Sequence, residues 1–298
     1  MQVSSRSYRH EEDFLAVMSF LRETYAETGS LHNWLPPRFE NSARGMAQGT
    51  RVWETLDGVQ GPRILAAATP EAKFRYFIQV HPDYVFLEEE IIQWIEGHCA
   101  AQRSEAGELK LSVVSLEGNP AREAVLRRRG FQKGARYGIL RLRDVDAPTP
   151  GHGVPEGFEV RSVRPRDFDE IARCIRAVFG HGEWFTGDVL DETSRASFYH
   201  EDLDLVVVDR EGKIVSFCTF RLDAPSGVTE LEPMGTLPEY RGRGLAKALL
   251  SEGIRRLEKY DPTLLYIGGA ADTPAANRLY EVTGFTDRYD YFFWDKMM

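Results

Sequence analysis

An internal repeat constrains the fold of this chain more than any other feature of its sequence. Pro-Asp-Tyr at 82–84 is matched by Pro-Glu-Tyr at 238–240, and Gly-Phe at 130–131 is matched by Gly-Phe at 284–285, with nearly equal spacing between these anchors. Self-similarity of this kind indicates a duplicated domain. A chain of 298 residues is long enough for two.

Strands and helices are expected in the same order in both halves. Hydrophobic periodicity in the first half predicts strands at 3–8, 63–69, 74–80, 109–116 and 135–143, and helices at 12–25, 88–102 and 121–129. In the second half it predicts strands at 159–163, 205–209, 214–222, 229–236, 264–268 and 289–294, and helices at 168–179, 189–198, 245–259 and 274–283. This alternation indicates an α/β (α+β) fold in each half.

A linker is expected between the halves. Residues 144–157 carry three prolines and three glycines and show no apolar periodicity. The predicted domains are therefore 1–144 and 158–298, with 145–157 as an exposed connection.

Composition and cysteine spacing exclude several classes of protein. The chain is 42% hydrophobic with a mean hydropathy of −0.38, and no segment approaches a membrane span. Its first residues lack a long apolar core, so the cytoplasm is the expected location. Cys99, Cys174 and Cys218 are odd in number and widely spaced, which argues against disulfides and structural zinc. The seven histidines form no ligand-like spacing, so no metal is expected.

The net charge of −9 is concentrated in the second half. Up to Asp144 the chain has 19 Lys and Arg residues and 19 Asp and Glu residues. After Asp144 it has 18 Lys and Arg residues but 27 Asp and Glu residues. An acidic field disfavours nucleic acid and favours a cationic partner. The alternative is that these surface acids serve solubility alone.

A strand, a glycine-rich turn and a helix follow one another within 231–259. Pro238 lacks an N–H group and ends the strand, while Gly242 and Gly244 permit the positive φ of a tight turn. The unpaired N–H groups at the helix start, with the arginines of the turn beside them, suit a pyrophosphate. Gly/Arg runs also occur in surface turns and RNA-binding tails, but those tails lie in low-complexity sequence. The spacing of a nucleotide P-loop is absent.

Two motifs of the second half resemble those of the GNAT N-acetyltransferase superfamily. Arg-Gly-Arg-Gly-Leu-Ala at 241–246 matches R/Q-x-x-G-x-G/A, and Asn-Arg-Leu-Tyr at 277–280 followed by Gly-Phe at 284–285 matches the second motif. The resemblance covers about 159–296, and the first half resembles a degenerate copy. The chain is thus similar to a tandem GNAT protein, with two GNAT-like domains that are each a mixed, mostly antiparallel sheet flanked by helices.

This resemblance implies that acetyl-CoA binds in a V-shaped split between two parallel strands, one of them at 231–237. Backbone groups are expected to hold the pantetheine arm and the acetyl carbonyl at Met234, Gly235, Thr236 and Leu237, and the pyrophosphate at Arg241, Gly242, Arg243, Gly244, Leu245 and Ala246.

Asn277 and Tyr280 are three residues apart and share one face of the second-motif helix. Asn277 is expected to bond the pantetheine amide, and Tyr280 to protonate the departing thiolate as a catalytic acid. The alternative is that Tyr280 is a packing aromatic.

A direct attack of a primary amine on the thioester requires a neutral nucleophile. An amine of pKa about 10.4 is neutral in only about one molecule in 2,500 at pH 7, a cost of about 4.6 kcal/mol that a base reduces. Glu230 and Glu232 lie two apart on a strand, so they share a face and are the candidate catalytic bases, directly or through water. Glu232 is preferred because Pro233 favours a bulge there. The alternative is that either acid is a solvent-facing residue.

The acceptor is expected to bind at the segment 180–192. Its candidate substrate-binding residues are Glu183, Trp184, Phe185 and Asp188. Aromatic walls with carboxylates suit an amine with an apolar body, although this segment also resembles an ordinary loop with a hydrophobic anchor. The expected acceptors are a polyamine or aminoglycoside, an amino acid or cysteinyl conjugate of the mycothiol-synthase kind, or a protein N-terminus.

The first half is expected to have lost the cofactor site. Counted from the shared tyrosine, Glu88 stands opposite Gly244, and the three carboxylates at 88–90 would repel a phosphate. Glu123 and Leu126 replace the polar pair of the second motif.

The role of this half is left open between scaffold, wall of the acceptor site and dimer interface. Its aromatic-rich region around Trp34 and Trp53 could pack on the second domain. The alternative to an enzyme is a non-catalytic CoA-binding or interaction module.

Overall fold

Each of two units in this chain has a β-sheet with helices on both of its faces. The structure is a computed structural model that describes residues 2–43, 48–55, 62–102 and 109–298. The first unit comprises Met1–Gly138 and Tyr289–Met298, and the second comprises Ile139–Arg288.

The first unit has the strand order β1-β2-β3-β4-β5-β12-β6. Its strands are β1 (Val3–Ser7), β2 (Arg51–Thr55), β3 (Arg63–Ala72), β4 (Arg75–Val80), β5 (Lys110–Leu116), β6 (Gln132–Arg143) and β12 (Asp287–Met297). The pair β4 and β5 is parallel, whereas β1 to β4 are joined by antiparallel pairings. A 3₁₀ turn, η1 (Pro82–Leu87), follows β4.

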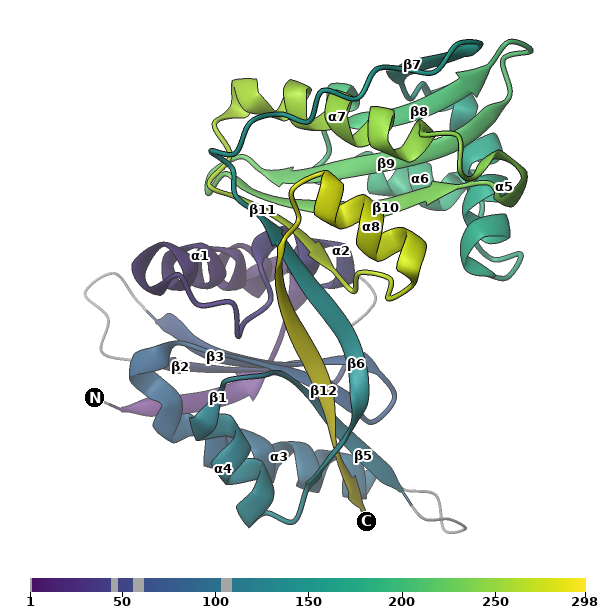
Figure 1. Cartoon of the computed structure of the whole chain (residues 1–298). Coiled ribbons are helices and arrows are strands. Elements are labelled where there is room, and N and C mark those ends of the chain that lie inside the picture. The colour runs from purple at the N-terminus through teal and green to yellow at the C-terminus, as the bar shows by residue number, and fades with distance from the viewer. Residues whose placement is uncertain (1, 44–47, 56–61, 103–108) are drawn as a thin grey trace. The chain divides into compact units, whose positions relative to one another are not determined.

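Helices cover both faces of this sheet. α1 (His10–Thr28) and α2 (Pro36–Ala43) lie on one face, and α3 (Glu88–Ala101) and α4 (Pro120–Arg128) lie on the other (Figure 1). Neighbouring residues of β4 alternate between the two cores, with Ile78 packed on the α3 side and Phe77 on the α1 side.

The second unit has the strand order β6-β11-β10-β9-β8-β7. Its own strands are β7 (Phe158–Ser162), β8 (Asp204–Asp209), β9 (Ile214–Asp223), β10 (Val228–Thr236) and β11 (Leu264–Gly268). Only β10 and β11 pair in parallel among these described pairs. The short 3₁₀ turns are η2 (Pro165–Asp167), η3 (Glu201–Leu203), η4 (Pro238–Tyr240) and η5 (Glu258–Tyr260).

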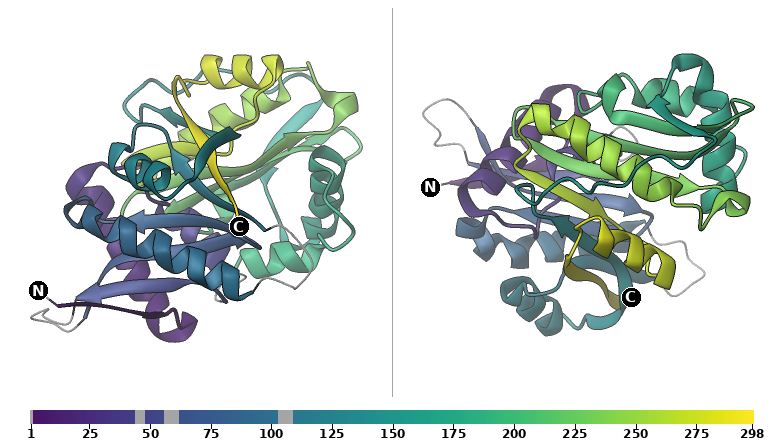
Figure 2. Two further views of the ribbon diagram at one scale, coloured as in Figure 1. Left: turned by 90° about the horizontal axis from the view of Figure 1, so that it is seen from below. Right: turned by 45° about the horizontal axis from the view of Figure 1, so that its top comes forward.

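α7 (Leu245–Leu257) and α8 (Pro274–Val282) cover one face of the second sheet, and α5 (Phe168–Phe179) and α6 (Gly187–Thr193) cover the other (Figure 2). The apolar side of α7 packs with β8, β9 and β10, and that of α5 packs with β8 and the start of β9. Both units therefore have the mixed, largely antiparallel sheet between helices that the sequence predicts.

The two halves exchange their last strands. β12 pairs antiparallel with β5 of the first unit, from Tyr291 opposite Leu116 to Met297 opposite Lys110. The end of β6 pairs antiparallel with β11 of the second unit, where Arg143 lies opposite Leu265. The sequence prediction assigns the strand 289–294 to the second half, where it would close the second sheet, and this assignment is wrong, because periodicity predicts a strand without specifying its partner.

The exchange also changes how the halves divide. The predicted linker, 145–157, lies in the second unit and contains no helix or strand. The predicted domains, 1–144 and 158–298, differ from the two compact units by the exchanged strands.

Two elements of the first unit, α2 and β2, are absent from the sequence prediction. Trp34, just before α2, is 5% exposed, and Trp53 in β2 is fully buried. Each packs in a hydrophobic core of its own unit, Trp34 against α1 and Trp53 against α3. Both rings are therefore core residues of the first unit.

The three cysteines are free and buried. Burial raises the pKa of the Cys99 and Cys174 thiols to about 11 and also raises that of Cys218, so none is a reactive thiolate. No group of His, Cys, Asp and Glu among the described residues is arranged to hold a metal ion. Nor does any helix in that part of the chain combine the length and apolar surface that a membrane crossing needs.

Candidate active site

The parallel strands β10 and β11 separate partway along β10. They pair from Val228 opposite Leu264 to Glu230 opposite Tyr266, after which β10 continues to Thr236 beside β9 alone. The pairing of β10 with β9 shifts register after Leu231, as a bulge does. The expected split between two parallel strands is therefore present in the second unit.

Backbone groups at the end of β10 face this split. Leu237 N donates to Val215 O of β9 at 3.0 Å. Because successive residues of a strand alternate their hydrogen-bonding side, the N–H and C=O groups of Thr236 point away from β9. Gly235 lies beside them, and a Cβ there would stand 2.7 Å from the ring of Phe217. A glycine is therefore required where the backbone passes under that ring.

The turn after β10 forms an open cradle at the start of α7. Gly242 and Gly244 have φ of 76° and 84°, a backbone conformation that side chains rarely adopt. The N-cap of α7 is Gly244, which has no side chain with which to cap the helix. The first N–H groups of α7 are therefore available to a ligand. A Cβ on Gly242 would meet nothing within 4 Å, so the space above the turn is open.

Two arginines flank this cradle. Arg241 donates from Nε to Thr236 O at 3.1 Å, and Arg243 donates to Glu239 O at 3.2 Å. The guanidinium of Arg243 also lies 5.1 Å from the ring centre of Tyr240. Positive charge, exposed N–H groups and a helix N-terminus together suit a pyrophosphate.

Helix α8 begins with a side-chain cap. Thr273 Oγ1 accepts from Ala276 N at 3.2 Å. Asn277 uses its amide within the protein, since Oδ1 accepts from Arg141 Nη2 at 2.8 Å and Nδ2 donates to Asp272 Oδ1 at 2.9 Å. The side chain expected to bond the pantetheine amide is thus positioned by two neighbours.

Tyr280 lies on the same helix and is 9% exposed. Burial raises the pKa of its hydroxyl, against the opposing effects of the Ala271 backbone and of the Arg141 charge. A raised pKa keeps the phenol protonated at neutral pH. The ring packs against Phe285 in an edge arrangement, with 6.3 Å between ring centres.

Arg141 is a site residue that the sequence prediction missed. It lies on β6, is 3% exposed, and donates to Phe285 O at 3.0 Å in addition to Asn277. Its guanidinium is 5.5 Å from the centre of the Tyr280 ring. The signal was an arginine in the apolar strand 135–143, but that strand was assigned to the first half.

The two candidate bases share one arginine. Arg221 Nη1 on β9 lies 3.6 Å from Glu230 Oε2 and 3.9 Å from Glu232 Oε2. The Glu230 side chain is fully buried, whereas that of Glu232 is 33% exposed. Both carboxylates therefore approach the same guanidinium, and only Glu232 is open to solvent. Arg221 was not recognised in the sequence.

A third carboxyl group, Asp204, lies on the neighbouring strand β8. Its oxygens accept from Thr219 Oγ1 at 2.8 Å and from Tyr199 OH at 3.0 Å. Burial raises the pKa of Asp204 to about 6, although both hydrogen bonds and the Arg221 charge oppose that shift. This part of the sheet is therefore rich in acidic groups.

The expected acceptor segment presents aromatic rings. His181 lies 5.7 Å from the ring of Trp184 and 5.3 Å from that of Phe185. Phe179 links His181, at 5.8 Å, to Phe217 beside Gly235, at 6.2 Å. A series of rings thus leads from the exposed Trp184 to the end of β10.

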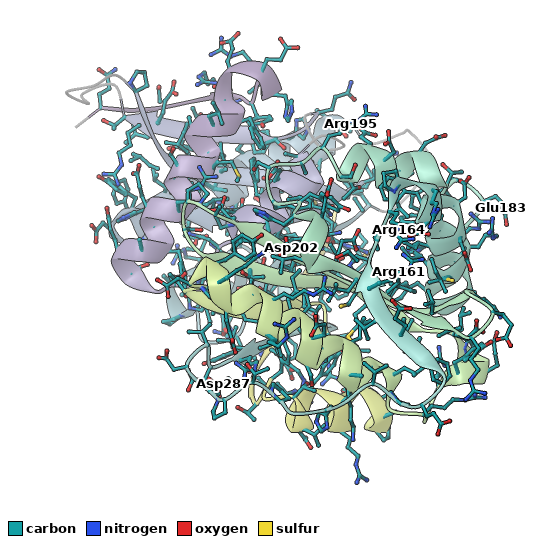
Figure 3. All side chains as sticks on the ribbon, turned by 90° about the horizontal axis from the view of Figure 1, so that it is seen from above. Arg161, Arg164, Glu183, Arg195, Asp202 and Asp287 are labelled. Atoms are coloured by element: carbon teal, nitrogen blue, oxygen red, sulfur yellow. The ribbon has the colours of Figure 1, made fainter. Side chains whose placement is uncertain are left out.

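The two acids expected in this segment are exposed. Glu183 is 94% exposed, lies 3.6 Å from Arg176, and points outward at the edge of the second unit (Figure 3). Asp188 stands exposed in the first turn of α6. The structure therefore groups Trp184 and Phe185 with the rings but leaves both acids at the surface.

Residues 170–285 match the acetyltransferase (GNAT) family. The mycothiol acetyltransferase of Streptomyces griseus is 34% identical over 140 residues, covering 45% of this chain and 44% of that protein. That of Acidothermus cellulolyticus is 31% identical over 188 residues, covering 56% of each chain. The chain spans about half the length of the curated relatives it matches.

Solved structures agree in fold over nearly the whole chain. A GCN5-related N-acetyltransferase from Sphaerobacter thermophilus has a TM-score of 0.66 at 19% identity, over 99% of this chain and 95% of that one. A tandem GNAT protein from the clavulanic acid biosynthesis pathway has a TM-score of 0.69 at 14% identity, over 99% and 98% of the two chains.

The fold is that of solved GNAT proteins, a tandem GNAT protein among them. Within the second unit, residues 170–285 match the acetyltransferase (GNAT) family, and mycothiol acetyltransferases are similar to about half of the chain.

Proposed function

We propose that the second unit transfers the acetyl group of acetyl-CoA to a primary amine by direct attack of that amine. The observation that carries this proposal is the split between β10 and β11 that leads into the uncapped start of α7. These groups fit acetyl-CoA, because the open, positively charged turn suits the pyrophosphate and the free edge of β10 suits an amide-containing arm. Acetyl-CoA supplies the activated acetyl group.

In this proposal, Met234 to Leu237 hold the arm and the acetyl carbonyl by backbone groups, and Arg241 to Ala246 hold the pyrophosphate. Asn277, fixed by Arg141 and Asp272, orients the arm through the amide hydrogen that it has left.

Glu232 is the proposed base that removes a proton from the amine, directly or through water. Glu232 is partly exposed, whereas Glu230 is fully buried. The proposed effect of Glu230 is therefore indirect and passes through Arg221, the guanidinium that both carboxylates approach. Three acids near one arginine give this region a negative charge, which favours a cationic acceptor.

Tyr280 is the proposed acid. Its burial keeps the hydroxyl protonated, so it can donate a proton when charge develops on the leaving sulfur.

The acceptor proposed is a primary amine whose apolar body lies on the ring series between Trp184 and Phe217. A small-molecule amine fits this better than a nucleic acid, given the acidic second half. The name of the relatives, mycothiol acetyltransferase, favours a cysteinyl conjugate among the amines expected from the sequence. A cytoplasmic location suits three free cysteines.

A thiol-release assay with acetyl-CoA and a panel of amines tests the proposal. The panel contains a cysteinyl sugar conjugate, a polyamine, an aminoglycoside and a peptide with a free N-terminus. We expect turnover with at least one amine and, with Glu232→Gln, a loss of about 10²-fold or more in kcat/KM. Tight acetyl-CoA binding without turnover on any amine would instead support the non-catalytic module.

A further inference from the structure

The first unit contains the same split as the second. β4 and β5 pair in parallel from Arg75 opposite Ser112 to Phe77 opposite Val114, and β4 then continues to Val80. His81 N donates to Leu65 O at 3.0 Å, as Leu237 N does to Val215 O in the second unit. The N–H and C=O groups of Val80 therefore point into the split, as those of Thr236 do.

We propose that the first unit fills this vestigial acyl-CoA groove with its own side chains, Asn33 in place of the pantetheine amide and the Glu88–Arg122 ion pair in place of the pyrophosphate. This inference rests on the cofactor site proposed for the second unit.

Asn33 satisfies both backbone groups of Val80. Its Oδ1 accepts from Val80 N at 2.8 Å, and its Nδ2 donates to Val80 O at 3.1 Å. The Asn33 side chain is buried, with 6% exposure. An amide that pairs with both groups of one strand residue makes the contact that an amide of the CoA arm would make at this edge.

The matching loop of the second unit turns its corresponding residue outward to solvent. α1 and α5 each end at a left-handed glycine, Gly29 and Gly180, and the next helix begins seven residues later, at Pro36 and Gly187. Asn33 thus corresponds to Trp184, which is 67% exposed. Two loops of equal length therefore differ in direction, one turned into its split and one turned to solvent.

A buried ion pair closes the other end of the groove. Glu88 is the first residue of α3, and its Oε1 lies 2.8 Å from Arg122 Nη2 of α4, with side chains 1% and 2% exposed. Counted from the shared Pro-x-Tyr and Gly-Phe anchors, these positions correspond to Gly244 and Ala276. The carboxylate takes the place at the helix N-terminus that suits a phosphate, and the pair joins α3 to α4.

The Arg122 charge of the ion pair acts on the loop that carries Asn33. His32, next to Asn33, is largely buried. Burial lowers the pKa of its imidazole, and the positive charge of Arg122 lowers it further.

Amide hydrogen exchange with and without CoA tests this in the full chain. We expect CoA to protect Thr236 and the first amides of α7, and to leave Val80 and the first amides of α3 unchanged. In Asn33→Ala, exchange at Val80 should rise about tenfold or more because one backbone hydrogen bond is lost. Trp184→Ala, the matched loop position, should leave exchange at Val80 unchanged.

Protection of Val80 or of the α3 start by CoA would overturn the proposal, as would unchanged Val80 exchange in Asn33→Ala. If CoA protects neither unit, the cofactor site proposed for the second unit fails. The Asn33→Ala comparison needs no ligand, so it still decides whether Asn33 fills the split.

Discussion

At the scale of single residues, Tyr280 is buried in the hydrophobic cluster that includes Leu231 of β10 and Ile267 of β11. Tyr280→Phe keeps the ring and its packing on Phe285 but removes the proton donor. We expect kcat to fall by about 10² to 10⁴-fold while acetyl-CoA affinity and Tm hold. Steady-state kinetics, calorimetry and thermal unfolding measure the three quantities. An unchanged kcat in a reaction limited by chemistry would reject the acid role, and a joint loss of Tm and activity would favour a packing role.

Asp204 makes stability depend on pH. Its pKa is about 6 in the folded chain, against 3.8 for an ordinary aspartate. The folded state therefore binds this proton more tightly, so the stabilisation from this group is present below about pH 4 and is lost as pH rises through about 6. At 1.36 kcal/mol for each pH unit between the two pKa values, the loss is about 3 kcal/mol.

Asp204→Asn retains an acceptor for Thr219 and Tyr199 but cannot ionise. Urea unfolding at pH 4, 5, 6 and 7 should show a wild-type stability that declines relative to that of Asp204→Asn by about 2.4 kcal/mol across this range, because the unfolded chain is already partly ionised at pH 4. The difference between the two proteins is the relevant quantity, because Asp167 and Asp13 have lowered pKa values and act in the opposite direction. A constant difference at all four pH values would contradict the prediction.

At the scale of elements, the start of α7 is a place where a substitution should abolish acetyl-CoA binding without unfolding the chain. Gly244→Glu places a side chain and a negative charge where the open turn would receive a pyrophosphate, so acetyl-CoA binding should be lost. Gly212→Glu is the matched control, since Gly212 has φ of 82°, is exposed, and has nothing within 4 Å of a Cβ. Both variants bear the same backbone strain, but only Gly244→Glu should fail in calorimetry with acetyl-CoA. Equal affinity of the two variants would reject α7 as the binding element.

At the scale of the whole molecule, the strand exchange decides which fragment can fold as the second unit. Residues 139–288 retain the end of β6, which pairs with β11 and carries Arg141. Residues 158–298, the predicted domain, lack that strand and leave the β11 edge unpaired. We expect the first fragment to fold and bind acetyl-CoA and the second to do neither, as measured by circular dichroism and calorimetry. Binding by 158–298 alone would show that the exchanged strand is dispensable.

The sequence by itself determined the elements and the chemistry of the turn. The bounds of α5 and the start of α7 agree with the prediction. These features depend on contacts within a few residues, on the φ that glycine permits, and on the period of apolar side chains, all of which a sequence displays directly.

Only the tertiary structure decided which strands and side chains meet. Arg141 bonds Phe285 across 144 positions, and Asn33 bonds Val80 across 47. Nothing local distinguishes a strand that completes its own sheet from one that completes the sheet of the other half, because both show the same alternation. Arg221 likewise became a partner of Glu230 and Glu232 only once β9 and β10 were placed in register. Pairings between distant segments are set by the packing of the whole chain, which is why the split and its turn were predictable and the residues that support them were not.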